Sequence, residues 1–220
     1  MLKTFLLTAF TVTALHFSSL PLGADSDADN LVDNPGFENG TSRFYLGVAA
    51  DSKTMNCRVS VDKANAHTGA QSALMQADDF ARVSFGPVAT IPVKPAEHYR
   101  VGVWVKPGSD FQMQPGTPGL VMRLNLSQDN APSSAGLIFI FLDDTVFPIG
   151  TPPNAPLAIT TPLSADWTHI EAVVEVPDNV DGIQPVLFFW KAKGSLNVDD
   201  FTFEKVDASV PLSKVVTSAP

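Results

Sequence analysis

Residues 98–106 read HYRVGVWVK, and this stretch decides the fold class. Aliphatic or phenol side chains at the odd-numbered positions alternate with small, polar and indole side chains at the even-numbered ones. A period of two predicts a β-strand with one buried face, because successive side chains of a strand point to opposite sides. The same alternation places Arg100 and Trp104 on the face opposite the aliphatic core.

The alternation recurs in residues 119–127 and 166–176. In the first of these windows Arg123 and Asn125 lie opposite a row of leucine and methionine side chains. Further alternating or apolar windows predict strands near 43–48, 57–62, 71–77, 80–86, 136–142, 185–191 and 195–206. The windows 137–142 and 186–190 are apolar on both sides, which is typical of central strands covered by a loop or by another layer.

Proline and turn-forming residues separate these windows. The chain contains 18 prolines in 220 residues, and each proline inside a helix costs about 3 kcal/mol. Short strands with such separators predict an all-β protein, an antiparallel β-sandwich of the jelly-roll type. The length fits a single domain, which we place at residues 30–206.

The ends of the chain are predicted to lie outside this domain. Lys3 is followed by a mostly apolar run at 4–17 and by small or turn-forming residues up to Ala24. A run this short cannot span the roughly 30 Å hydrocarbon core of a bilayer, so residues 1–24 are interpreted as a signal peptide. Residues 25–29 form an acidic leader and 207–220 a polar tail without an apolar docking pattern. We therefore expect a secreted, periplasmic or extracellular protein without membrane insertion.

Charge and cysteine content exclude several functions. The formal net charge is −9, which disfavours nucleic acid, whose binding depends on Lys and Arg neutralising phosphates. The single Cys57 cannot form an intrachain disulfide, and no Cys and His spacing matches a zinc site.

Catalytic motifs are also missing from the sequence. Nucleophile-elbow, zinc-protease, phosphate-loop and dinucleotide motifs are absent. Adjacent acids on a strand are expected to point to opposite faces, so no acidic doublet forms a catalytic pair by itself. The doublets in question are 78–79, 143–144 and 199–200. We therefore predict that the chain is not an enzyme. A jelly-roll polysaccharide lyase in particular would need a basic cleft.

Four segments occur in an order that resembles the CenC-like carbohydrate-binding modules, which are galactose-binding-domain-like jelly rolls. These segments are NLVDNPGFE at 30–38, AHTGAQSAL at 66–74, YRVGVWVK at 99–106 and LNVDDF at 196–201. Together they cover most of the predicted domain, from its first strand to its last.

The resemblance implies a structural Ca²⁺ where the two ends of the domain meet. By similarity its ligands are the side chains of Glu38 and Asp199 and the main-chain oxygens of Gly36 and Ala70. Carboxylate and carbonyl oxygens are the ligands that Ca²⁺ prefers. Two alternatives stay open: Glu38 and Asp199 could instead accept hydrogen bonds from turn amides, or Asp200 could replace Asp199 if the strand register differs by one.

The resemblance also implies a neutral polysaccharide or oligosaccharide lying across one sheet of a monomer. The candidate contacts are Arg100, Trp104, Arg123, Asn125 and Trp190. Trp104→Ala is then predicted to abolish polysaccharide retention with little loss of stability. The alternative function is a structural or adhesive β-sandwich protein of the cell envelope that binds no sugar.

Overall fold

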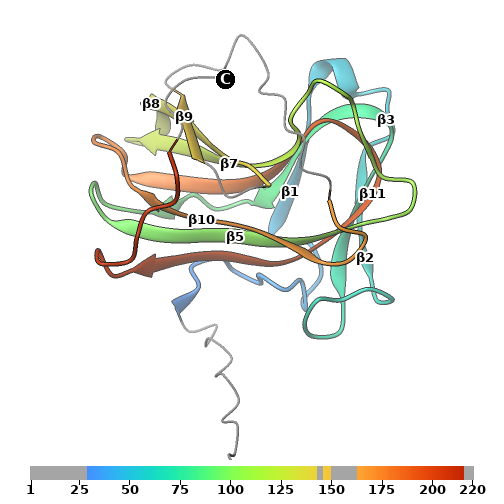
Figure 1. Ribbon diagram of the computed structural model, residues 1–220, viewed down its shortest axis with the longest axis horizontal. Coiled ribbons are helices and arrows are strands. Elements are labelled where there is room, and N and C mark those ends of the chain that lie inside the picture. Colours follow the sequence, from blue (N-terminus) through green and yellow to red (C-terminus); the bar gives the residue numbers. More distant parts are fainter. Residues whose placement is uncertain (1–28, 143–145, 150–162, 216–220) are drawn as a thin grey trace, which may run out of the picture.

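Antiparallel strands make up nearly all regular structure of the described residues (Figure 1). A computed structural model describes residues 29–142, 146–149 and 163–215. The strands are β1 Phe44–Val48, β2 Arg58–Asp62, β3 Ser72–Pro87, β4 Ile91–Pro92, β5 His98–Pro107, β6 Gln112–Met113, β7 Gly119–Gln128, β8 Ala131–Ile140, β9 Val146–Ile149, β10 Thr168–Glu175 and β11 Gly182–Val206. The three-residue 3₁₀ turn η2, Ala50–Ser52, lies between β1 and β2. The described residues contain no helix that is long and apolar enough to cross a membrane.

Two long strands, β3 and β11, run through both layers of the sandwich. In one layer, the β5 layer, the order is β2-β3-β11-β5-β10. In the other, the β7 layer, it is β1-β3-β11-β7-β8-β9. The expected antiparallel β-sandwich is therefore confirmed.

The long strands pass between the layers through β-bulges. The β3–β11 register shifts between Trp190 and Ala192 and again between Ala192 and Gly194. Gly194 has a φ of 88°, and a Cβ there would lie 2.3 Å from the carbonyl oxygen of Asp110. The expectation of separate strands at 185–191 and 195–206 is therefore wrong, because the irregular residues bend one strand without ending it.

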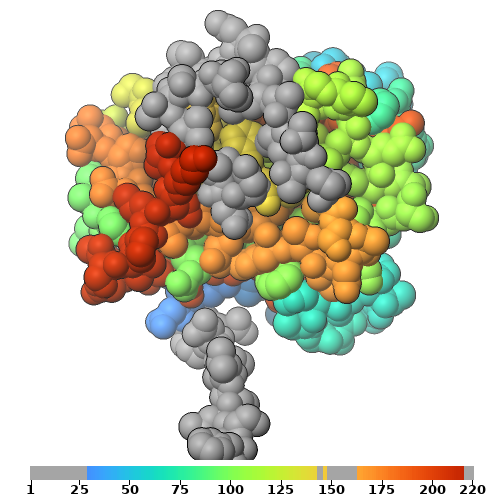
Figure 2. Space-filling model, in the orientation of Figure 1, coloured from blue at the N-terminus to red at the C-terminus, as the bar shows by residue number. Residues whose placement is uncertain are grey.

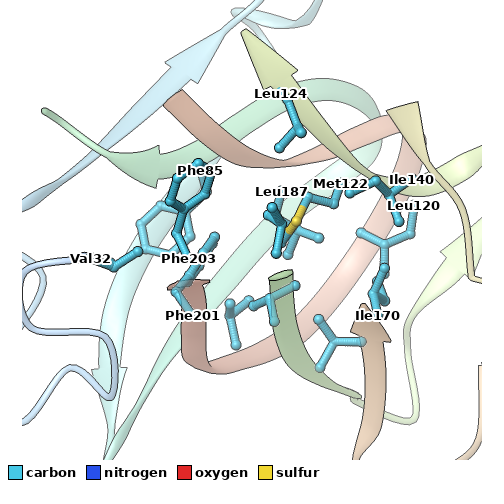
Figure 3. Packing of buried hydrophobic residues seen from close by; sticks show 14 of the residues in the cluster. Val32, Phe85, Leu120, Met122, Leu124, Ile140, Ile170, Leu187, Phe201 and Phe203 are labelled. Carbon is cyan, nitrogen blue, oxygen red and sulfur yellow. The ribbon is translucent and has the colours of Figure 1, made fainter. Parts of the chain in front are cut away.

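The core lies between the layers and follows the predicted alternation (Figure 3). Val101, Val103 and Val105 of β5 are fully buried and Tyr99 is 3% exposed. Aromatic rings fill the end of the sandwich near the first and last strands, where Phe37 lies 5.8 Å from Phe85 between ring centroids. Apolar burial of this kind is the main source of stability for a domain without a disulfide.

The C-terminal segment docks on the sandwich, contrary to the expectation from its polar composition. The Ser213 amide donates to the Val173 carbonyl at 3.0 Å, and the Ser213 hydroxyl accepts the Val173 amide at 2.9 Å. The Val146 amide donates to the carbonyl of Lys214 at 2.8 Å. Figure 2 shows this red segment lying against β10. Backbone pairing holds the segment, and hydropathy patterns do not detect such pairing. The predicted signal peptide and most of the acidic leader lie outside the described residues.

Candidate functional site

The five predicted sugar contacts lie on two different outer surfaces. Arg123 and Asn125 of β7 and Trp190 of β11 point away from the core on the β7 layer, a surface we call the β7 face. Arg100 and Trp104 of β5 lie on the opposite surface, the β5 face. The structure therefore brings three of the five residues together and separates the other two from them.

Arg123 is held firmly in the middle of the β7 face. Its guanidinium carbon lies 4.6 Å from the centroid of the Phe188 ring, and its Nη2 donates to the Ser84 hydroxyl at 3.1 Å. The Tyr45 side chain of β1 lies close enough to those of Arg123 and Asn125 for both to lower its pKa against the larger effect of burial. Burial raises the pKa of Tyr45 and lowers that of Arg123. At neutral pH the face therefore presents a neutral phenol beside a fixed cation.

Two amide side chains follow along the same face. Asn125 Nδ2 donates to Gln184 Oε1 at 3.1 Å. Gln184 Nε2 in turn donates to the carbonyl oxygens of Pro87 at 2.9 Å and Val88 at 3.2 Å. Both amides are oriented by these bonds and keep capacity for further partners, because each amide has two donor hydrogens and an oxygen with two lone pairs.

Aromatic side chains form the other end of the β7 face. The half-buried Trp190 ring lies 5.8 Å from Phe188 and 5.4 Å from Phe139 between centroids. Phe139 belongs to a second apolar cluster outside the main core, together with Val121, Phe141 and Phe147. The prediction that residues 137–142 and 186–190 are apolar on both sides and covered is thereby explained.

On the β5 face, Trp104 is sandwiched between two histidines. The His67 ring lies 3.9 Å from it at an interplanar angle of 16°, and the His169 ring 4.5 Å away at 7°. The edge of Trp167 contacts His67 at 5.5 Å. Both faces of the Trp104 ring are covered, so the stacking predicted for it requires a histidine to move.

Arg100 is also engaged on the β5 face. Its guanidinium forms an ion pair with Glu204 and lies 3.8 Å from a carboxylate oxygen of Glu171. His169 is neutral at pH 7, because burial and the charges of His67 and Arg100 lower its pKa to about 4. Its buried Nε2 has no hydrogen-bond partner, and a Cβ at Gly102 would lie 2.8 Å from that atom.

The predicted calcium ligands surround the loop 66–70. Asp199 is fully buried, and its Oδ2 accepts the amides of His67 at 2.8 Å and Thr68 at 3.4 Å. Glu38 Oε1 accepts the Ala70 amide at 3.0 Å. Glu38 and Asp199 thus accept hydrogen bonds from turn amides, as in the alternative to calcium binding stated above. The described part of the chain holds no group of three or more His, Cys, Asp or Glu side chains arranged to bind a metal.

The expectation that Asp199 and Asp200 point to opposite faces is wrong. The β5–β11 register shifts between Asp199 and Thr202, and Asp200 has a φ of 45°. The bulge turns both carboxylates toward the loop, where Asp200 accepts hydrogen bonds from Thr68 Oγ1 at 2.8 Å and contacts His67 Nδ1 at 2.7 Å. A Cβ on Gly36 would lie 3.1 Å from Asp200 Oδ1 and 3.7 Å from Asp199 Oδ1.

The electrostatics of this loop bear on whether its residues fit a cation. Burial, together with the neighbouring Asp200 charge, raises the pKa of Asp199 to about 7. The hydrogen bonds that Asp199 receives come from main-chain amides. A buried carboxylate that gains no cationic partner is costly to ionise. The carboxylates of Glu38 and Asp199 are chemically suited to a hard cation such as Ca²⁺, but within the described residues they are not part of a group of three potential His, Cys, Asp or Glu ligands.

Three residues of the β7 face were not identified from the sequence. Tyr45 and Gln184 lie on β1 and β11, next to Gly86 and Asn125 respectively in the strand register. Phe188 lies in an apolar run in which both faces look alike. Only the pairing of β11 with β7 could have placed Gln184 and Phe188 beside the predicted Asn125 and Arg123.

Comparison with solved structures supports the fold. The chain is 19% identical to a family 16 carbohydrate-binding module, with a TM-score of 0.50, and the match covers 81% of this chain and 100% of that one. The enzymatically active domain of bacteriophage CBA120 tailspike protein 4 gives 14% identity and a TM-score of 0.57 over 82% of this chain. The match spans only 22% of the tailspike chain.

The chain has a carbohydrate-binding-module-like fold. A further neighbour, TmCBM61 in complex with β-1,4-galactotriose, shares 19% identity at a TM-score of 0.48, covering 80% of this chain and 99% of that one. No sequence family and no curated protein matches the chain. In this carbohydrate-binding-module-like fold the β7 face is the outer surface that combines half-buried aromatic rings with oriented amides.

Proposed function

We propose that this chain is an exported, non-catalytic carbohydrate-binding domain that holds a neutral glycan on the β7 face. The observation that carries the proposal is the side-by-side placement of aromatic rings and oriented polar groups on one sheet surface. Phe188 and Trp190 offer apolar ring surface, while Arg123, Asn125 and Gln184 offer fixed donors and acceptors. Sugar rings have an apolar face and a rim of hydroxyls, and this surface complements both.

The charge distribution supports a neutral ligand. The protein carries a net charge of −9, which repels anionic polysaccharides at long range. The Arg123 guanidinium is shared among Phe188, Ser84 and Tyr45. It therefore serves as a positioned donor for hydroxyl groups more readily than as an open anion site.

The expected affinity is modest. Covering about 100 Å² of sugar with an aromatic ring contributes roughly 2.5 kcal/mol at about 25 cal/mol per Å². Two such rings, less the cost of association, give dissociation constants in the micromolar to millimolar range. Binding of this strength suits a domain that associates reversibly with an insoluble polymer.

The test is retention on a panel of insoluble neutral polysaccharides, with polygalacturonate as the anionic comparison. Wild type should be retained on at least one neutral polymer and not on polygalacturonate. Trp190→Ala should lower the affinity by about 50-fold or more, as expected from losing about 2.5 kcal/mol of ring contact. Trp167→Ala is the matched control, because its indole lies on the β5 face against His67.

If Trp190→Ala and Trp167→Ala are both retained as well as wild type, the glycan does not bind against Trp190 on the β7 face. If wild type is retained on no polysaccharide, the alternative gains weight: a structural or adhesive cell-envelope protein that uses the sandwich only as a scaffold.

We also propose a structural Ca²⁺ held by the side chains of Glu38 and Asp199 and the main-chain oxygens of Gly36 and Ala70. The support is the buried Asp199 carboxyl group beside the charge of Asp200, since a bound cation would offset both the burial and the repulsion that raise its pKa. Asp199 accepts two main-chain amides at Oδ2 and one at Oδ1, and Glu38 accepts one at Oε1, so both carboxylates keep lone pairs for a cation. The ion would stabilise the loop 66–70 against the ends of the domain.

Thermal unfolding with and without chelator tests the calcium proposal. EDTA should lower the Tm of wild type, and added Ca²⁺ should restore it, because a ligand that binds only the folded state stabilises that state. Asp199→Asn should make the Tm insensitive to EDTA. Asp78→Asn, which changes an exposed acid paired with Arg58, should keep the wild-type response. A wild-type Tm that ignores both EDTA and Ca²⁺ rules the ion out.

A further inference from the structure

A pocket lies at the amide end of the β7 face. Its volume is about 480 Å³. Its floor includes Asn125 and Gln184, the two amides already described, with Leu137 beside them. The pocket is therefore continuous with the proposed glycan surface.

A bulge in β8 builds one wall of this pocket. Asn125 pairs with Leu137 and Ser127 pairs with Pro132, so two steps along β7 correspond to five steps along β8. The extra residues leave the regular ladder, and Ser133 and Gly136 among them line the pocket. Gly136 has a φ of 85°, a backbone conformation that favours glycine.

Other segments complete the lining and tie the neighbouring strand ends together. Thr90, from the connection after β3, lines the pocket and lies against Gly182 at the start of β11. At the end of the strands, Asp181 Oδ2 accepts the Asp129 amide at 2.8 Å, and the Asp181 amide donates to the Ser127 carbonyl at 3.0 Å. These bonds tie the β7–β8 turn to the start of β11 where the face ends.

The pocket is lined by uncharged groups. Its polar side chains are amides and hydroxyls, from Thr90, Asn125, Ser127, Asn130, Ser133 and Gln184. No ionisable side chain is among its lining residues in the described part of the chain. Groups of this kind exchange hydrogen bonds with sugar hydroxyls and offer no charge to a uronate or an amine.

We propose that this pocket receives the terminal residue of a neutral glycan, so that the β7 face binds chain ends and not the interior of a chain. This inference rests on the proposed function of the same face. From Trp190 to Gln184 the strand covers roughly 20 Å at about 3.3 Å per residue, enough for a short oligosaccharide. A glycan that follows the strands from the aromatic rings toward Gln184 meets the β8 bulge at this pocket, next to the ends of the strands.

The experiment counts binding sites per mass of polysaccharide before and after limited endo-hydrolysis. The polymer is one on which wild type is retained, and hydrolysis creates new chain ends without changing its sugar composition. The number of protein molecules bound at saturation should rise in proportion to the ends. Oligosaccharides of that polymer, intact, reduced with borohydride at one end or blocked at the other, should then identify which end occupies the pocket.

Two pocket variants and one face variant sharpen the result. Gln184→Ala should lower the affinity for oligosaccharides by about tenfold, and Asn130→Gly, which keeps the left-handed backbone, should lower it by about threefold. Trp190→Ala should lower the affinity for every form of the polymer. The number of Trp190→Ala molecules bound at saturation should still rise in proportion to the number of chain ends. Circular dichroism confirms that each variant is folded.

The outcomes separate this inference from the proposed function. A saturation capacity that stays constant per mass after hydrolysis, with retention intact, overturns chain-end binding and leaves glycan binding in place. An absence of retention on every polymer overturns both. Wild-type affinity in Gln184→Ala and Asn130→Gly overturns the assignment to this pocket.

Discussion

The two outer faces of the sandwich carry similar residue types in different states. On the β5 face, Trp104 is stacked between His67 and His169, and Arg100 is paired with carboxylates. On the β7 face, Trp190 contacts Phe188 and Phe139, and Arg123 lies over an aromatic ring among uncharged polar groups. On the β5 face, the aromatic and charged side chains are therefore already in contact with other residues of the protein. On the β7 face, oriented amides and partly exposed aromatic ring surface can accept a ligand.

This difference shows what strand alternation can and cannot decide. Alternation correctly places Trp104 on the outer side of β5, since its neighbours Val103 and Val105 are fully buried. It says nothing of the histidines, which come from the loop 66–70 and from β10. An outward-pointing side chain is therefore only a candidate, and the strands beside it determine its availability.

The largest expected effect is a decrease in the free energy of unfolding in Trp104→Ala. Removing the indole leaves a gap between two stacked imidazoles, and losses of about 2–4 kcal/mol in the free energy of unfolding are expected for a large, mostly packed side chain. Urea denaturation measures this loss. Polysaccharide retention, measured at a temperature where the variant is folded, should match wild type.

Trp167→Ala provides the control for that measurement, with an expected loss of about 1 kcal/mol or less because its ring meets His67 only at the edge. If Trp104→Ala instead abolishes retention and keeps the stability of wild type, the role predicted from the sequence is right. The β5 face would then be the glycan surface, and the two faces would exchange their functions.

The sequence was sufficient for the positions of most strands and for the buried side of those with clear alternation. Val101, Leu124 and Ile170 could be assigned to the core because period-two patterning is a local property of the chain. Arg123 and Asn125 were placed on an outer face for the same reason, whereas Trp190 ends a run that is apolar on both sides. Arg100 and Trp104 could not be separated from these residues, since the sheet to which a strand belongs depends on pairing between residues far apart.

Irregular backbone accounts for most of the remaining differences. The bulge at Asp200 turns two adjacent acids to the same loop, and the bulges near Trp190 join two predicted strands into β11. The β8 bulge creates the pocket wall. Bulges shift side-chain direction by one residue, and a pattern with a fixed period cannot detect them.

The next expected effect is on the pH dependence of the free energy of unfolding, measured in EDTA. Asp199 and His169, both near Trp104, contribute to it with opposite signs, so the net effect in wild type is small. Folded Asp199 keeps its proton up to about pH 7, whereas an unfolded aspartate loses it near pH 4, so the free energy of unfolding falls as pH rises across this window. Folded His169 takes up a proton only near pH 4, whereas an unfolded histidine does so near pH 6.5. Its contribution therefore falls as pH drops.

Variants should separate the two contributions. In wild type they largely cancel between about pH 4 and pH 6.5, where each alone amounts to roughly 3–4 kcal/mol over about 2.5 pH units at about 1.4 kcal/mol per pKa unit. Asp199→Asn should make stability rise with pH in this window, and His169→Phe should make it fall. The double variant should again be nearly flat. Slopes of the same sign in both single variants would contradict the assignment. Urea denaturation at a series of pH values gives these slopes.

The smallest expected effect concerns the ion pair of Arg100 with Glu204 on the β5 face. Both side chains are partly exposed, at 32% and 18%, and partly exposed pairs contribute about 0.5–1 kcal/mol because solvent screens them. Glu204→Gln should lower stability by about that amount in low salt and by less in 1 M salt. Glycan affinity should stay at the wild-type value in Glu204→Gln and in Arg100→Met, which keeps an unbranched apolar side chain. A loss of affinity in Arg100→Met alone would show that the guanidinium contacts the ligand itself. Glycan binding would then not be confined to the β7 face.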